Sequence, residues 1–300
     1  MNSNHVDPEV VSRPDEAIKD EINERLWRER MVRWLDINQF IVEVKDGEAL
    51  IYGHISAENN YALIEKIVRE VPGVKAVQNN LVIDRDLVVE VSGALYRDER
   101  TRPLIIPVSA RHGWITLGGS VPNRDLQCAV EEVAASVPSV RGVTALPYIT
   151  GEKPFPARRA LQPAPGATVY LNNNFAGIVR SVVISPRSRM VTHMIVDTAR
   201  SVNDSSAPVV VVPVEKIEVT SAGGVRDGNI FIEDRSPELR TYPVYKEKDY
   251  IQPPAGWQPP FPYTRDEILW SVQEASQVKV QEEHRQEKKE TAGVAGSLDR

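Results

Sequence analysis

Apolar and polar positions follow one plan twice along the first half of the chain. Around residues 42–83, two alternating stretches joined at Asp46-Gly47 predict a β-hairpin. Apolar residues at helical spacing then predict a helix over about residues 58–70, and a third strand follows. Residues 108–149 repeat this plan 66 positions later, with His112-Gly113 at the turn. The pattern therefore predicts two copies of one small α+β unit.

A further helix is expected to open each copy. Asp15 and Glu16 follow Pro14 and occupy a favourable first turn, which predicts a helix to about residue 33. A weaker helix is expected over about residues 88–100, because Gly93 lowers its propensity. Each αββαβ unit then has two helices on one sheet face, a minimal core, and we expect the two copies to pack together.

The second half changes character. Residues 151–165 contain four prolines and predict an extended linker. Short apolar strands with turn residues between them then predict a small antiparallel β-barrel within residues 166–250. The expected strands are 168–171, 176–184, 190–198, 209–212, 217–220 and 229–233.

The segment 251–300 predicts a proline-rich, partly helical tail. Proline favours an extended conformation here, and Trp257, Phe261 and Tyr263 are interleaved with it. These aromatic residues either cover the chain's own barrel or anchor the segment in a partner's groove. Thr264 and Glu267 form a capping box that predicts a helix to about residue 290, followed by a disordered end.

Composition limits the function classes. The net charge is −6, and residues 1–84 alone hold 10 Lys/Arg against 16 Asp/Glu, which also gives −6. No segment is basic enough to favour nucleic acid as the main partner. No apolar run approaches the roughly 18 residues of a membrane-spanning helix, and residues 1–14 read as a flexible, polar N-terminus without a secretion signal. Cys128 is the single cysteine, so we expect a cytoplasmic protein without disulfides.

No catalytic, cofactor-binding or metal-binding constellation is predicted. The histidines are scattered, and no pair has ligand spacing; they are His5, His54, His112, His193 and His284. Cys128 lies on a predicted helix as a small apolar group. Gly53 and Gly119 stand inside strands, where glycine permits a bulge or a close approach of backbone. The sequence therefore favours a non-enzymatic protein.

One feature suggests a partner. On the first helix, Trp27, Met31 and Trp34 form a second apolar stripe opposite the core-facing positions, flanked by the basic residues Arg28, Arg30 and Arg33. A helix that is apolar on two faces is usually covered on both. The stripe either packs on the second copy, or lies beyond the end of the helix, or forms an interaction surface for another protomer or a lipid headgroup zone.

The duplicated plan resembles the BON domain. The resemblance rests on Ile51-Tyr52-Gly53-His54-Ile55 with its counterpart at 117–121, and on Val71-Pro72-Gly73-Val74 with its counterpart at 137–140. It covers residues 15–84 and 85–150. It implies binding to phospholipid surfaces or partner proteins, often in envelope stress, and some members bind potassium through backbone carbonyls. Ser139 in place of Gly73, and Pro147, are departures in the second copy.

The segment 166–235 resembles the PRC-barrel, through Gly177-Ile178-Val179, Val191–Val196 and Val212-Pro213-Val214. This resemblance implies protein or RNA contact. The leading hypothesis is a bacterial-type scaffold, stress-related, that associates with proteins through the repeats and barrel. The alternatives are peripheral phospholipid binding through the repeats and RNA or ribosome association through the barrel.

Overall fold

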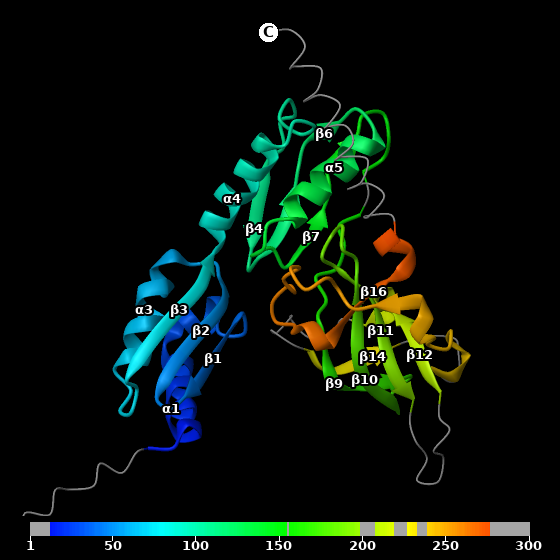
Figure 1. The fold of residues 1–300 in the computed structure, drawn as a ribbon. Helices are drawn as coiled ribbons and strands as arrows, with labels where there is room; N and C mark the ends of the chain where they lie inside the picture. Colours follow the sequence, from blue (N-terminus) through cyan, green and yellow to red (C-terminus); the bar gives the residue numbers. More distant parts are fainter. Residues whose placement is uncertain (1–12, 155, 199–207, 219–226, 233–238, 277–300) are drawn as a thin grey trace, which may run out of the picture. The chain divides into compact units, whose positions relative to one another are not determined.

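The computed structural model describes residues 13–154, 156–198, 208–218, 227–232 and 239–276 (Figure 1). The chain divides into two compact units, Met1–Asp86 and Leu87–Arg300, and each is described by itself. The predicted α+β class is confirmed. Among the described residues, no helix is both long and apolar enough to span a bilayer.

The first unit is a three-stranded sheet with helices on it. Its elements are α1 (Asp15–Arg28), α2 (Arg30–Leu35), β1 (Phe40–Lys45), β2 (Glu48–Ile55), α3 (Glu58–Arg69) and β3 (Ala76–Ile83). β1 and β2 pair antiparallel, and β2 and β3 pair in parallel. The turn residues Asp46 and Gly47 both have positive φ, as a two-residue hairpin loop requires. The core consists of apolar residues that include Ile18, Ile22, Leu26, Val42, Ile51, Ile64 and Val68.

The expectation of one helix to about residue 33 is wrong. Glu29 takes an extended conformation with ψ 112°, and α2 begins at the next residue. The break lets Val32 join the core and brings Asp36 to the start of α3. The buried carboxylate of Asp36 accepts hydrogen bonds there from the amide and hydroxyl of Ser56, both at 2.8 Å, and from the side chain of Asn60 at 2.6 Å.

The second copy opens the second unit with a similar order of elements. They are α4 (Asp84–Arg97), β4 (Val108–Arg111), β5 (Trp114–Leu117), β6 (Ser120–Val121), α5 (Arg124–Ala135), β7 (Gly142–Ala145) and β8 (Tyr148–Ile149). The helix α4 therefore starts and ends earlier than the expected 88–100. No described helix corresponds to α2, and the second and third strands of this copy are each interrupted, so that β4-β5-β7 and β6-β8 form separate sheets. β7 and β8 are separated at Pro147, which has no N–H to donate to a ladder.

The C-terminal sheet is curled into a half-barrel (Figure 1). Its strands are β9 (Pro163–Leu171), β10 (Asn174–Ile184), β11 (Val191–Thr198), β12 (Val209–Pro213), β13 (Ile217–Glu218), β14 (Asp227–Ile232), β15 (Tyr250–Ile251) and β16 (Ile268–Ser271). The described strands run in the order β12-β11-β10-β9-β14-β13. The expectation of an antiparallel barrel is wrong for two pairs, since β14 pairs with β9 and β16 with β10 in parallel.

The segment predicted to be an extended linker contacts both of its neighbours. Arg158 donates its amide to the carbonyl of Thr144 and forms an ion pair with Glu131 of α5. Arg159 donates to the carbonyl of Ile217, at 2.9 Å. The strand β9 already begins at Pro163. This segment therefore lies against the second copy on one side and the C-terminal sheet on the other.

The capping box of Thr264 and Glu267 is present, but it begins a single 3-10 turn over Arg265–Glu267. The strand β16 follows in place of the predicted helix, because Ile268 and Trp270 are buried beside β10. Residues 272–276 are helical. The rest of the predicted helix, the expected disordered end and most of the expected flexible N-terminus lie outside the described residues.

Candidate interaction surface

Four apolar side chains at the end of α1 and along α2 are exposed to solvent. Trp27 is 55%, Met31 53%, Trp34 73% and Leu35 40% exposed, whereas Ile18, Ile22 and Leu26 of α1 are buried. We call these four residues the Trp27–Leu35 surface. Large apolar side chains gathered on the outer side of a helix add nothing to the core, and such patches mark interaction sites.

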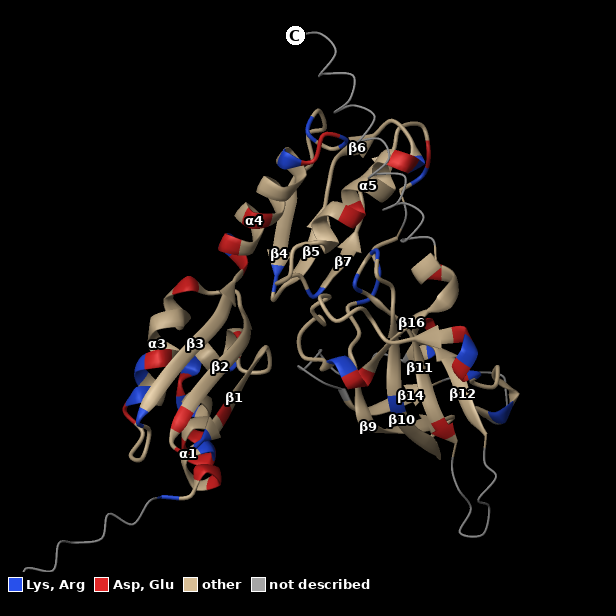
Figure 2. Ribbon diagram, viewed as in Figure 1, with Lys and Arg blue, Asp and Glu red and all other residues tan. Residues whose placement is uncertain are grey.

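Arginines flank this surface. The Arg30 guanidinium lies 5.7 Å from the centroid of the Trp34 ring, within range of a cation–π interaction. Arg33 donates to the carbonyl of Trp27 at 3.5 Å, and Arg28 pairs with Glu24 at 2.5 Å. Figure 2 shows both acidic and basic residues along α1. The structure therefore places the six sequence-predicted residues of this region on two successive helices.

The predicted aromatic residues of the tail lie against the chain's own second unit. The ring of Trp257 packs edge-on against Trp270, at 5.2 Å between centroids. Phe261 stacks on the guanidinium of Arg141 at 5.4 Å. Tyr263 is buried and donates to the carbonyl of Pro163 at 2.9 Å. Of the two interpretations, the arrangement favours cover for the C-terminal sheet.

Sequence reasoning missed two buried arginines at the junction of the second copy with the C-terminal sheet. Arg141 is 1% and Arg189 3% exposed. Arg141 lies over the Trp114 ring at 4.9 Å, and Arg189 over the Trp257 ring at 4.9 Å. Burial lowers the pKa of Arg189 to about 10. Nothing in the local sequence distinguishes either arginine from a surface residue, because its partners come from distant segments.

Gly53 and Gly119 have similar backbone conformations and similar neighbouring backbone. Both have positive φ, 131° and 82°. A Cβ on Gly53 would lie 2.6 Å from the carbonyl oxygen of Gln39, and one on Gly119 would lie 2.9 Å from that of Ile105. Gln39 and Ile105 are themselves 66 positions apart. The close approach of backbone at these glycines is therefore a feature of both copies.

The remaining candidates do not converge on a reactive site. His54 is buried in β2, and His112 occupies the β4–β5 turn. Burial lowers the pKa of His193, which the Glu215 carboxylate partly opposes. Cys128 is partly buried, with the Arg187 guanidinium 3.8 Å from its sulfur. Within the described ranges, no three His, Cys, Asp or Glu residues are grouped to hold a metal ion; His5 and His284 lie outside them.

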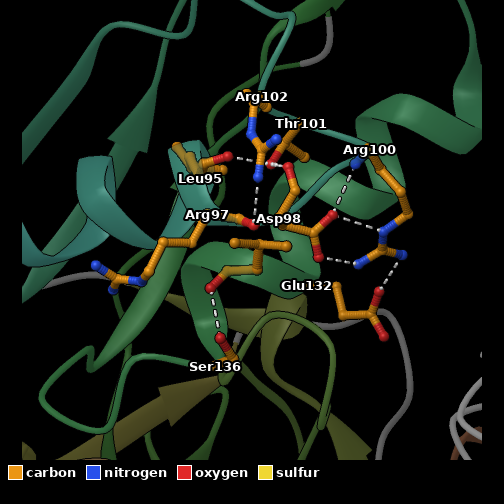
Figure 3. A network of polar contacts seen from close by, with 9 residues as sticks. Leu95, Arg97, Asp98, Arg100, Thr101, Arg102, Glu132 and Ser136 are labelled. Carbon is orange, nitrogen blue, oxygen red and sulfur yellow. Dashed lines mark hydrogen bonds and ion pairs between the residues drawn. The ribbon is translucent and has the colours of Figure 1, made fainter. Parts of the chain in front are cut away.

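A polar network holds the end of α4 (Figure 3). Thr101 donates its hydroxyl to the carbonyl of Leu95 at 2.6 Å. Arg100 joins Asp98, at 3.0 Å, to Glu132 of α5, at 2.9 Å. Hydrogen bonding to Asp98 raises the pKa of Arg100. Because these charges are mutually paired, the network fixes α4 on α5 and offers no reactive group.

Parts of the chain are similar to known proteins. No curated protein matches the chain. Two solved structures of CdsD, a structural protein of the type III secretion system of Chlamydia trachomatis, are similar at 18% and 19% identity, with TM-scores of 0.38 and 0.39. The matches cover 46% and 48% of this chain and 67% and 65% of those structures, so the chain spans about two thirds of each. Residues 14–85 and residues 84–146 each match the BON domain.

Proposed function

We propose that the chain is a non-enzymatic binding protein that associates with proteins, a partner or further copies of itself, through the Trp27–Leu35 surface of its first repeat. Two matches to a domain family support a modular binding role. The further expectation, that the C-terminal half-barrel also associates with proteins, follows from its resemblance to the PRC-barrel alone, and the proposal here concerns the repeats. The expected place in stress response follows from the BON resemblance alone.

The exposure of Trp27 and Trp34 is the observation that carries the proposal. A Trp side chain buries roughly 150–250 Å² when it is covered. Because Trp27 is 55% and Trp34 73% exposed, leaving both in water forgoes roughly 5–8 kcal/mol of burial free energy at about 25 cal/mol per Å². Tryptophan, methionine and arginine are also the residue types enriched in protein interfaces.

The second candidate function is peripheral contact with phospholipid. The tryptophans with Arg28, Arg30 and Arg33 beside them are suited to a headgroup zone. The charge of residues 1–84 opposes this candidate, since anionic lipid repels a net charge of −6. Protein association is therefore the stronger of the two.

The double variant Trp27→Ser/Trp34→Ser tests the proposal, with Phe175→Ser, an exposed aromatic residue of β10, as the matched control. Light scattering measures self-association, and flotation with neutral and anionic vesicles measures lipid contact. We expect the double variant to keep its fold and lose association, while the control behaves as wild type. Association that persists in the double variant rejects this surface.

A further inference from the structure

The two opening helices align at a different offset from the strands that follow them. The buried residues Ile18, Ile22 and Leu26 of α1 correspond to Leu87, Val91 and Leu95 of α4, and each pair is 69 positions apart. The hairpin turns are 66 positions apart. The connection from helix to strand is therefore three residues shorter in the second copy.

At this offset the exposed aromatic residue of the first copy has a counterpart. Trp27 falls on Tyr96, which is 69% exposed, and Arg33 falls on Arg102. Arg33 donates to the carbonyl of Trp27 at 3.5 Å, and Arg102 donates to the carbonyl of Tyr96 at 3.1 Å. Each copy thus ends its opening helix with an exposed ring and an arginine hydrogen-bonded to the backbone of that ring's residue. We call this pair the aromatic–arginine element.

A guanidinium lies over an exposed ring near this position in both copies, although in the first copy that ring is Trp34, the neighbour of the element, and in the second it is Tyr96 itself. The Arg102 guanidinium is 5.8 Å from the centroid of Tyr96, and Arg30 is 5.7 Å from that of Trp34. Arg102 also donates to the carbonyl of Arg97, as Figure 3 shows. Capping the helix end accounts for the arginine contacts with carbonyls. It does not account for a large ring in water at the same position of both copies.

The charges of these elements are not neutralised within the structure. No carboxylate in the described part of the chain forms an ion pair with Arg30, Arg33, Arg97 or Arg102, in contrast to Arg28 and Arg100. A guanidinium with free donors recognises a carboxylate, and the adjacent ring takes an apolar side chain. The combination fits a segment in which carboxylates alternate with an apolar anchor.

We propose that the aromatic–arginine element is a binding element present twice, which takes an acidic, apolar-anchored segment of a partner protein. This inference rests on the proposed function and extends it to the second copy, at Tyr96 and Arg102. A membrane plane would expose all of residues 1–84, with their net charge of −6, to anionic lipid. A peptide segment meets only the basic element, so charge favours the peptide.

Two elements on one chain make binding bivalent. A partner with two such segments gains affinity from the second contact without any new interaction, because that contact is intramolecular. The test uses a labelled 12-residue peptide with Leu at every third position and Glu or Ser elsewhere. A tandem form joins two copies through about 40 Gly/Ser residues, which span roughly 35 Å on average and impose no particular spacing.

Fluorescence anisotropy with the full chain then compares W27A/R33A, Y96A/R102A, their combination, and the control F175A/R180A, an exposed aromatic–arginine pair on β10. Wild type and control are expected to bind the tandem peptide at least tenfold more tightly than the single one. Each double variant loses that advantage, and the combination loses binding. Circular dichroism confirms the fold of each.

The outcomes separate the two proposals. If W27A/R33A weakens binding but Y96A/R102A leaves tandem affinity unchanged, the second element is rejected and the proposed function stands. If neither variant changes binding, both fail. If phosphatidylserine vesicles bind the wild-type chain and neither peptide does, the assignment of an acidic protein partner is overturned.

Discussion

Replacing Arg189 with methionine tests whether buried guanidinium contacts hold the second copy to the C-terminal sheet. Arg189 is 3% exposed. Its Nη2 donates to the carbonyls of Pro138 and Gln258, at 3.1 and 2.8 Å, and its Nη1 donates to that of Ala135 at 3.5 Å. Three segments therefore meet at one side chain. Methionine keeps most of the apolar stem and loses these bonds.

The loss of stability in R189M is the difference between the favourable contacts of the guanidinium and the cost of burying its charge. Three charge-assisted hydrogen bonds contribute about 2 kcal/mol each, and the cation–π contact with Trp257 contributes about 1–2 kcal/mol. Against this, burial lowers the pKa of Arg189 from 12.5 to about 10, which corresponds to a cost of about 3 kcal/mol for the buried charge. Arg189 also has a φ of 58°, but methionine shares that strain. The expected net loss in the free energy of unfolding is about 4–5 kcal/mol.

Urea unfolding followed by tryptophan fluorescence measures this loss, since Trp257 and Trp270 lie in the same unit. The control is R180M, an exposed arginine of β10, for which we expect a change within about 0.5 kcal/mol. If R189M unfolds at the same urea concentration as R180M, the buried contacts contribute no net stability and the reasoning is refuted.

Three further predictions concern single residues. The free energy of unfolding is expected to fall by about 3 kcal/mol in G53A and by about 1–2 kcal/mol in G119A. The reason is that the added Cβ comes as close as 2.5 Å to backbone at Gly53 and 2.9 Å at Gly119. Equal shifts of the two urea midpoints would contradict this. D36A removes a buried carboxylate that accepts three hydrogen bonds, so its free energy of unfolding, measured by calorimetry, is expected to fall by about 2–3 kcal/mol. A melting temperature equal to that of wild type would refute this. Since burial lowers the pKa of His193, the unfolded chain binds more protons than the folded chain, so stability falls as pH drops from 6.5 through the folded pKa. His193→Gln should flatten that dependence in urea titrations between about pH 5 and 8, and an unchanged slope contradicts the assignment.

Local chemistry made much of the first unit predictable. Asp46-Gly47 marks a two-residue hairpin, and period-two apolar positions on either side fix which strand faces are buried. The helix α3 has a single apolar face, with Ile64 and Val68 toward the sheet. The break at Glu29 was not predictable, because no proline or glycine marks it and helix formers continue through it.

Contacts between residues far apart in the sequence explain why the remaining features could not be predicted. The run Ile268–Trp270 is short enough to suit a helix or a strand, and only its pairing with β10, far back in the chain, selects the strand. Arg141 and Arg189 look like surface residues until distant carbonyls and rings surround them. Of the candidate surface, Trp27, Met31 and Trp34 were apparent from their spacing. Tyr96 and Arg102 were not apparent, because the strands of the two copies align at an offset of 66 positions, whereas their opening helices align at an offset of 69 positions.

The most direct test of a binding role for the repeats is a quantitative pull-down from native lysate. The full chain, the W27S/W34S variant and the F175S control serve as baits, with retained protein identified by mass spectrometry. The account predicts that wild type and F175S retain the same partner, or further copies of the chain, and that W27S/W34S loses it. Equal retention by all three baits would contradict the account.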